Sequence, residues 1–295
     1  MFFAQRGRIF GKATTPLDRE RQKIYNGFVY ASLVGRLRDK ENFMRMKKML
    51  AFLLASLLLL GSLLLFGGCG RSVSYENEEA YSVGSFKTTE NVHAVKIYWD
   101  GRAVSVGAAY RNDISATEDY RETDGKAMRY KIDGGVLEIY PASSGKSVEK
   151  LEKTLFLEIP MEMMNSIHSF TIETVGDTKV NLQMMNAEDV SVTTEDGNVS
   201  VDGALSILNV KTEKGNLDVK SATVLSLDFT SITGDASLSL HLQGFTAVMR
   251  NENGSFTTDY AASENERIYT YGTQESVLTF MTEGNVTLRD YDIAQ

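Results

Sequence analysis

Three histidines are the side chains of this sequence that most often ligate metals or act as general bases. They are His93, His168 and His241, and they lie in different segments with no second histidine at ligand spacing. A metal site or a general base needs several converging partners. None is visible in the sequence, so we expect surface or strand-filling histidines, no metal site and no cofactor.

Acidic residues gather near the glycine turns described below, namely Glu195, Asp196, Glu213, Asp235, Glu252 and Glu283. Glycoside hydrolysis needs two carboxylates held at a fixed separation in one cleft, one of them with a raised pKa. Here the acids are spread along the chain, which is simpler to explain as solvated turns. We therefore predict that the protein is not an enzyme. A polysaccharide-active β-helix enzyme is the alternative.

Other sites of chemistry are not indicated. The sequence contains no G-x-S-x-G and no G-x-x-x-x-G-K-[ST], so nucleophile-elbow and phosphate-loop chemistry lack their motifs. Tyr98, Trp99 and Tyr110 are candidates for facing a sugar. Aromatic residues on strands, however, more commonly pack in a core or pair across strands, which is the expectation here.

Charge divides the 295 residues into three parts. Residues 1–48 hold twelve Lys or Arg against four Asp or Glu, residues 49–68 hold no charge, and the rest holds 19 Lys or Arg against 35 Asp or Glu. A basic, then apolar, then acidic order is typical of a chain sent across a membrane. The acidic part, with a net charge of −16, also argues against nucleic acid as a partner.

The apolar run ends in Leu65-Phe66-Gly67-Gly68-Cys69-Gly70. This resembles the lipobox of bacterial lipoproteins, although Phe66 replaces the usual aliphatic residue. The resemblance implies cleavage between Gly68 and Cys69, lipidation of Cys69, and a protein anchored in the cell membrane that faces outside the cytoplasm. An uncleaved anchor is the alternative, because the run nearly spans a bilayer. Cys69 is the only cysteine, so an internal disulfide is excluded.

These observations predict four segments. Residues 44–68 are a lipoprotein signal peptide beginning at Met44 or Met46, with Lys47 and Lys48 as its positive flank. Residues 1–43 are an uncertain leader: we expect a wrongly assigned start, and a small cytosolic helix is the alternative. Residues 69–90 are polar and predict a spacer. Residues 91–295 form one all-β domain.

The first part of that domain alternates apolar and polar residues between glycine-rich turns, which indicates strands. The expected strands are 92–99, 103–107, 127–132, 136–140 and 154–159. From residue 161 onward there is no proline, which suits an uninterrupted hydrogen-bonded ladder.

A repeat follows, with a glycine at the centre of each copy. The glycines are Gly176, Gly197, Gly215, Gly234, Gly254 and Gly284, with spacings of 21, 18, 19, 20 and 30 residues. Aliphatic residues recur at alternate positions on both sides of the glycine, as Val192 and Val199 do around Gly197. A period near 20 predicts stacked copies, because no single copy can bury its own apolar face.

Stacking places equivalent residues in columns with a spacing of about 4.8 Å. We expect one interior column of Val192, Val210, Phe229 and Met249, and a positive φ at each corner glycine. The residue after each glycine is polar, and these residues predict a second column: Asp177, Asn198, Asn216, Asp235, Ser255 and Asn285. Turn chemistry and Asn stacking explain this column, with a calcium site as the alternative. A hairpin at each Asp-Gly is the alternative fold.

The T-x-x-G-N-V-x-V copies, the strand Leu155-Phe-Leu-Glu-Ile-Pro160 and the closing Val277-Leu-Thr-Phe-Met-Thr-Glu-Gly-Asn-Val-Thr-Leu288 resemble the bacterial putative-adhesin family of β-strand-repeat proteins. The resemblance covers about residues 88–290. It implies an exported, right-handed β-solenoid (parallel β-helix-like) of about five to six coils after a strand-rich N-terminal part. It carries no established catalytic residues.

Together these inferences predict a non-catalytic, adhesin-like binding or scaffolding protein, held to the membrane by its lipid, with an envelope or extracellular glycan or protein as ligand. An envelope-stress sensor or accessory protein is the alternative from a different class.

Overall fold

The computed structural model describes residues 72–119, 125–148 and 151–291. Gly68, Cys69, the leader and the signal peptide lie outside the described residues. Within the described part, helical structure is limited to the 3-10 turn η2 (Glu78–Ala80) and α2 (Met161–Met164), which confirms the all-β prediction. None of its helices has the length and apolar character that crossing a membrane requires.

The strands form two ladders of largely parallel pairs. Ladder A runs, in spatial order, through β7 (Val136–Tyr140), β3 (Ala94–Trp99), β9 (Ser169–Thr174), the second halves of β10 (Lys179–Thr193) and β11 (Val199–Lys211), β13 (Ser226–Thr230), β19 (Ser276–Met281) and β15 (Gly244–Met249).

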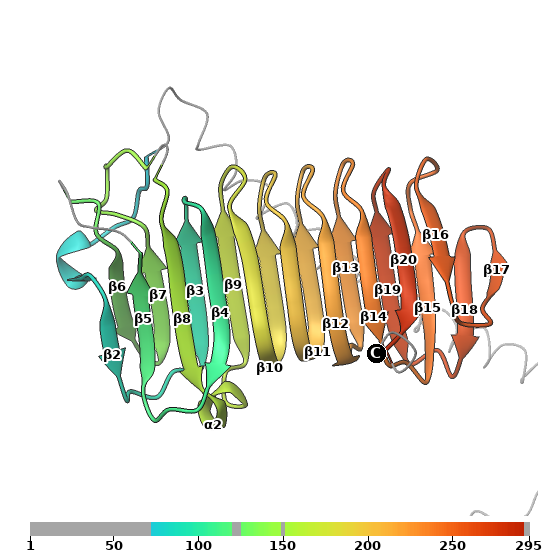
Figure 1. Ribbon diagram of the computed structural model, residues 1–295, viewed down its shortest axis with the longest axis horizontal. Helices are drawn as coiled ribbons and strands as arrows, with labels where there is room; N and C mark the ends of the chain where they lie inside the picture. The colour runs from blue at the N-terminus through green and yellow to red at the C-terminus, as the bar shows by residue number, and fades with distance from the viewer. Residues whose placement is uncertain (1–71, 120–124, 149–150, 292–295) are drawn as a thin grey trace, which may run out of the picture. The chain divides into compact units, whose positions relative to one another are not determined.

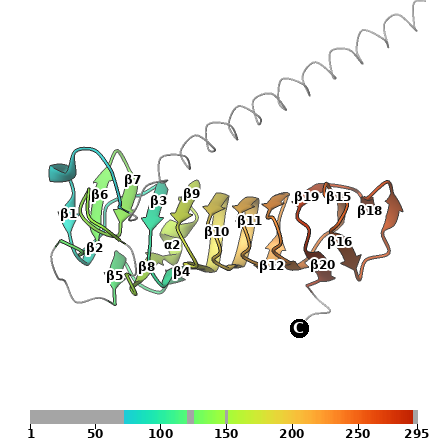
Figure 2. The same ribbon diagram turned by 90° about the horizontal axis from the view of Figure 1, so that it is seen from above.

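Ladder B lies opposite. It runs through β8 (Thr154–Pro160), β4 (Ala103–Ala109), the first halves of β10 and β11, β12 (Leu217–Thr223), β14 (Ala236–Leu240), β20 (Asn285–Asp290) and β16 (Ser255–Thr258). We call one strand of ladder A and the ladder B strand that follows it in the chain a rung. Figure 2 shows β9, β19 and β15 on one side of the stack and β4, β12 and β20 on the other.

Antiparallel strands extend the ladders at both ends. At the N-terminal end, β6 (Arg129–Asp133) and β1 (Ser82–Val83) continue ladder A, and β5 (Ile114–Glu118) and β2 (Phe86–Thr88) continue ladder B. At the other end, β18 (Ile268–Gly272) and β17 (Ser263–Asn265) continue ladder A. The segment predicted as a spacer thus contributes β1, β2 and η2 to the fold, and Val73 packs with Ala142, Val148 and Leu151.

The five strands expected before Pro160 all exist, with ends shifted by at most two residues. Two pairs of them form complete rungs, 94–109 and 136–160, and these join the rungs of the glycine repeat. The strands that the sequence analysis missed are short or antiparallel: β1, β2, β5, β17 and β18.

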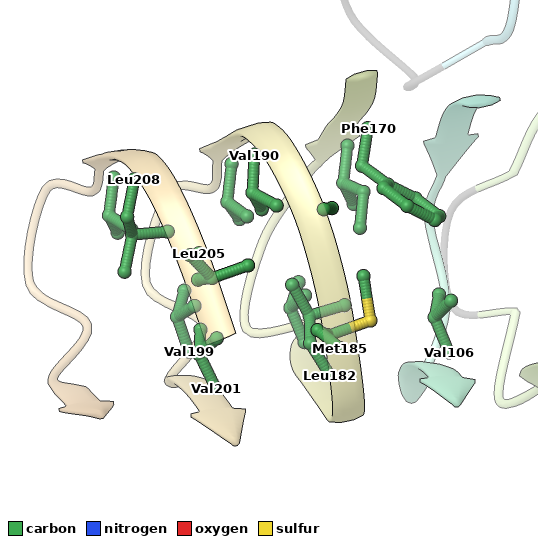
Figure 3. Close-up of a cluster of buried hydrophobic side chains, with 14 of the residues drawn as sticks. Val106, Phe170, Leu182, Met185, Val190, Val199, Val201, Leu205 and Leu208 are labelled. Atoms are coloured by element: carbon green, nitrogen blue, oxygen red, sulfur yellow. The ribbon is translucent and has the colours of Figure 1, made fainter. Parts of the chain in front are cut away.

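The core lies between the ladders, where inward side chains stack on their counterparts in the next rung. Val192 pairs in register with Val210, and Val210 with Phe229; all three are buried. Val190 and Leu208 of ladder A face Val199 and Val201 of ladder B across the core (Figure 3). Burial of such side chains stabilises a fold by about 1.5–3 kcal/mol each. The hairpin alternative is therefore wrong for these copies, because their strands pair in parallel between copies.

The order of the rungs differs from the expected one at both ends. Phe229 pairs with Phe280, and Phe280 pairs with Met249, so the predicted contact of Phe229 with Met249 is wrong. Rung 276–290 is inserted between rungs 226–240 and 244–258. At the other end, rung 94–109 is inserted between rungs 136–160 and 169–183. Figure 1 shows both insertions as breaks in the order of colours.

Candidate functional site

The corner glycines are needed for close backbone approach. A Cβ added to Gly215 would overlap the carbonyl oxygen of Gly197 and lie 2.7 Å from its carbonyl carbon, and one added to Gly234 would overlap Gly215 in the same way. The predicted positive φ is wrong at Gly197, Gly215, Gly234, Gly254 and Gly284, none of which adopts it. Only glycine fits because one rung lies directly on the next, rather than because of a left-handed turn.

The column of glycines is also composed differently from the expectation. Gly176 has a φ of 69° and lies outside the column, where Thr178 takes its place beneath Gly197. At the far end, Gly284 lies against Gly234, and Gly254 against Gly284, which follows from the inserted rung.

Buried hydroxyl groups support this corner, and the sequence analysis gave them no role. The hydroxyl oxygen of Thr212 accepts the Gly215 N–H at 2.8 Å and donates to the Glu195 carbonyl at 2.7 Å. Ser231 makes the equivalent pair of bonds with Gly234 and Glu213. A Thr or Ser three residues before the glycine, in the T-x-x-G copies, was the available signal.

The side chains of the polar column after the glycines form hydrogen bonds along the stack. The Oδ1 atom of Asn198 accepts the Asn216 N–H at 2.9 Å, and Oδ1 of Asn216 accepts the Asp235 N–H at 2.9 Å. Asn285 and Ser255 continue the column beyond Asp235. These oxygens are acceptors for the backbone, and within the described residues no His, Cys, Asp or Glu group is arranged to hold a metal ion.

The remaining predicted candidates do not converge. His93, His168 and His241 are exposed, and His168 contacts Glu188 at 3.3 Å between Nδ1 and Oε2. Of the turn acids, Glu195 accepts the Gly176 N–H at 2.7 Å, and Asp196 lies 3.8 Å from the Lys214 ammonium.

Three other carboxyls have pKa values raised by burial. They belong to Glu173, Asp189 and Asp228, which lie on the outer face of ladder A in three different rungs. These three carboxyls occupy three different register positions of the ladder, so they do not form the facing pair that glycoside hydrolysis requires.

A buried ion pair fixes the N-terminal end of the stack. The ammonium of Lys153 is fully buried, lies 2.5 Å from Glu118 Oε2, donates to the carbonyls of Lys126 and Pro141, and sits 4.9 Å above the Trp99 ring. Burial lowers the pKa of Lys153, and the pairing with Glu118 opposes that effect. Three acceptors match the three donors of an ammonium group, so the arrangement is structural.

The aromatic candidates separate. Trp99 is buried in the core, whereas Tyr110 is 92% exposed after β4. Tyr98 lies on the outer face of ladder A in a cluster of stacked rings formed by Tyr75, Tyr81, Tyr98 and Tyr140. Tyr98 and Tyr140 are 4.8 Å apart, Tyr140 and Tyr75 4.1 Å. Their faces therefore cover one another.

The polar atoms beside this cluster are also engaged. The Tyr81 hydroxyl donates to Glu138 at 2.6 Å, and Lys96 lies 3.4 Å from the same carboxylate. Burial acts to raise the pKa of Glu138, but the hydrogen bond from Tyr81 and the charges of Lys131 and Lys96 outweigh it and lower the pKa.

The outer face of ladder B carries a shallow depression that sequence reasoning missed. Its floor is a grid of two rows across β10, β11 and β12: Asn181, Ser200 and Asp218 in one row, Gln183, Asp202 and Lys220 in the other, with Met184 beside them. Its volume is about 280 Å³. We call this surface the Met184 depression.

A bulge in β10 creates the depression. The pairing with β11 shifts between Leu182 and Met185, and the extra residue Met184 adopts a left-handed φ of 50°. Gly203 of β11 faces the bulge, because a Cβ there would overlap the Met185 backbone. A non-glycine residue in this conformation is uncommon, and bulges and strained residues recur at functional sites.

The six polar side chains of the grid make no hydrogen bond or ion pair among those identified in the described residues. This distinguishes them from the asparagine column and from the tyrosine cluster, whose polar atoms are already paired. The Met184 depression therefore offers both hydrogen-bond donors and acceptors to a ligand.

Comparison with known proteins assigns the repeat. Residues 165–289 match the model of the family Toastrack DUF4097, and the expected resemblance to the bacterial putative-adhesin family is confirmed. No curated protein matches.

Two solved structures match this chain. One is a putative cell adhesion protein from Clostridium sporogenes, with a TM-score of 0.42, 12% identity, and coverage of 71% of this chain and 100% of that one. The other is a putative adhesin from Bacteroides fragilis, with a TM-score of 0.37, 10% identity, and coverage of 71% and 97%.

Proposed function

We propose that the protein is a lipid-anchored, non-catalytic, adhesin-like binding protein that faces outside the cytoplasm. The match to the toastrack family, the lipobox-like Gly68-Cys69 sequence and the acidic mature part support this proposal. We propose further that the two ladders form a right-handed β-solenoid, since connections between parallel strands of one sheet are right-handed in nearly all proteins.

The Met184 depression is the single observation that carries the binding role. The hydroxyl supports, the asparagine column and the Lys153–Glu118 pair serve the fold, whereas the depression gathers polar side chains that have no such role. Glu173, Asp189 and Asp228, the three carboxyls with raised pKa values, lie on separate rungs at different register positions, which supports a role in binding rather than in cleavage.

Binding is tested with the full-length protein, purified in detergent and screened against arrays of glycans and envelope components. Retention of at least one component class, without chemical change to it, is the expected result. Cleavage of a bound polysaccharide would instead identify the enzyme alternative, and retention of nothing would contradict the binding role.

Anchoring is tested separately by Cys69→Ser. The thiol is the only group that can accept the lipid, so the variant is expected to leave the membrane fraction or to remain uncleaved. Unchanged membrane retention at the mature size would contradict lipidation of Cys69.

A further inference from the structure

We propose that the Met184 depression binds a neutral glycan chain through its hydroxyl groups. The proposal rests on the binding function above and gives that function a site and a ligand class.

The depression offers hydrogen-bond partners of both kinds. The amides of Asn181 and Gln183 and the ammonium of Lys220 donate, whereas the carboxylates of Asp202 and Asp218 only accept. The grid therefore presents donors and acceptors side by side, on strands about 4.8 Å apart. A sugar hydroxyl both donates and accepts, so a polyhydroxylated ligand can satisfy neighbouring positions that a ligand with donors only or acceptors only would leave unpaired.

The charge of the depression favours a neutral ligand. Two aspartates and one lysine give the lining a net charge of −1, within a mature chain of net charge −16. An acidic polysaccharide would be repelled by both. Lys220 lies opposite Asp202 in the neighbouring strand, and its positive charge reduces the attraction of the lining for a cationic ligand. A neutral chain avoids both costs.

The exposed methionine adds an apolar surface to the depression. The Met184 side chain is 50% exposed beside the polar grid, where the bulge holds it out of the core. A thioether is a flexible apolar surface, suited to the C–H face of a sugar ring, while the grid takes its hydroxyls.

The test is a titration of the full-length protein in detergent with four hexamers: cellohexaose and chitohexaose as neutral chains, hexagalacturonate as an acidic chain, and the chitosan hexamer as a cationic chain. We expect a neutral hexamer to bind. The acidic and cationic hexamers should bind at least tenfold more weakly. Tighter binding of a charged hexamer at this site would overturn the proposed ligand class.

Two variants place the ligand. Met184→Gly removes the thioether at a backbone conformation that glycine adopts freely, so the fold is kept. Asn181→Ala removes one amide from the grid. Each is expected to weaken neutral-hexamer binding at least fivefold, and their combination more.

The matched control is Asn209→Ala, the same substitution at an outward position on ladder A, which pairs with Ser191 and Asp228 on its neighbours. It is expected to leave binding unchanged. If the arrays retain a glycan but Met184→Gly and Asn181→Ala bind it as the control does, the depression is not the site and the binding function stands. If no glycan or envelope component binds the unaltered protein, the binding function itself fails.

Discussion

Both ends of the stack contain an inserted rung, but the two ends differ in the strands and contacts that cover them. At each end, the rung that comes first or last in the described chain is inserted one place inward, so that its neighbour in sequence becomes the outermost rung. At the N-terminal end, antiparallel strands cover both ladders, and the Lys153–Glu118 pair ties down the connecting segments.

At the C-terminal end, ladder A is covered by β18 and β17, while β16 of ladder B pairs, within the described residues, only with β20. Aromatic contacts replace the ion pair there: Phe256 packs on Tyr269 at 4.4 Å, and Phe245 on Tyr260 at 5.5 Å. The comparison teaches that a repeat needs a different solution at each end, because each outermost rung lacks the neighbour that would bury its face.

The largest effect is expected from removing the inserted C-terminal rung by truncation after Gly272. Its inward side chains are Leu278, Phe280, Val286 and Leu288, each contributing about 1.5–3 kcal/mol by burial. β15 and β16 lose their parallel partners β19 and β20. Residues 244–272 should then exchange their amide hydrogens rapidly, with residues 169–240 still protected. Continued protection of 244–258 would mean that this rung docks directly on rung 226–240.

Next in size is Lys153→Ala at the N-terminal end. It leaves the Glu118 carboxylate, whose side chain is only 6% exposed, without its cation, and removal of one partner of a buried pair costs about 3–5 kcal/mol. Urea unfolding measures the loss. The double variant Lys153→Met/Glu118→Gln removes both charges and should recover more than half of it. A loss below about 1 kcal/mol would show that this end does not depend on the pair.

A smaller effect is expected at the middle of the stack from Gly215→Ala. The added methyl group would overlap the Gly197 carbonyl, and overpacking of this kind costs about 1–3 kcal/mol. Gly107→Ala is the control, because its Cβ would meet nothing closer than 3.5 Å, and its stability should change by less than about 0.5 kcal/mol. Equal effects of the two substitutions in thermal unfolding would remove close stacking as the reason for the glycine.

The smallest effect is expected from Glu173→Gln. Burial raises the folded-state pKa of Glu173 above its ordinary value of 4.5. A raised carboxyl pKa favours folding below the unfolded-state pKa, and that contribution is lost as the pH rises through the folded-state pKa. Glutamine resembles the protonated form. The variant should therefore melt about 1–2 °C above the unaltered protein at pH 7, and at the same temperature as the unaltered protein at pH 4. An equal gain at both values would exclude titration as the cause.

The repeat was predictable because its aliphatic residues alternate at fixed distances from the glycine, and Val192 and Val210 indeed pair. The insertion of rung 276–290 was not predictable, because Met249 and Phe280 are both apolar and either can stack on Phe229. Pattern alone does not choose between such neighbours. The sequence indicated this insertion only through the 30-residue spacing between Gly254 and Gly284, because the segment between them contains β17 and β18.

The Met184 depression was hidden for a related reason. Alternation from Val180 and Leu182 predicts an inward residue 184, yet Met185 is buried and Met184 is exposed. The alternation of inward and outward residues shifts by one only at the Met184-Met185 pair. Methionine has no preference for a left-handed conformation, so its presence does not predict a bulge. Gly203, which faces the bulge, lies in another repeat.

The inserted C-terminal rung also constrains the order of assembly. Residues 276–290 leave the ribosome after residues 244–258, yet they occupy the place between those residues and rung 226–240. A chain that emerges from its N-terminal side cannot complete this end by simple addition of rungs. Residues 244–272, which carry the β18–β17 hairpin, stay unburied until residues 276–290 arrive. A chain whose synthesis stalls before residue 290 would therefore present an open sheet edge to any protease nearby.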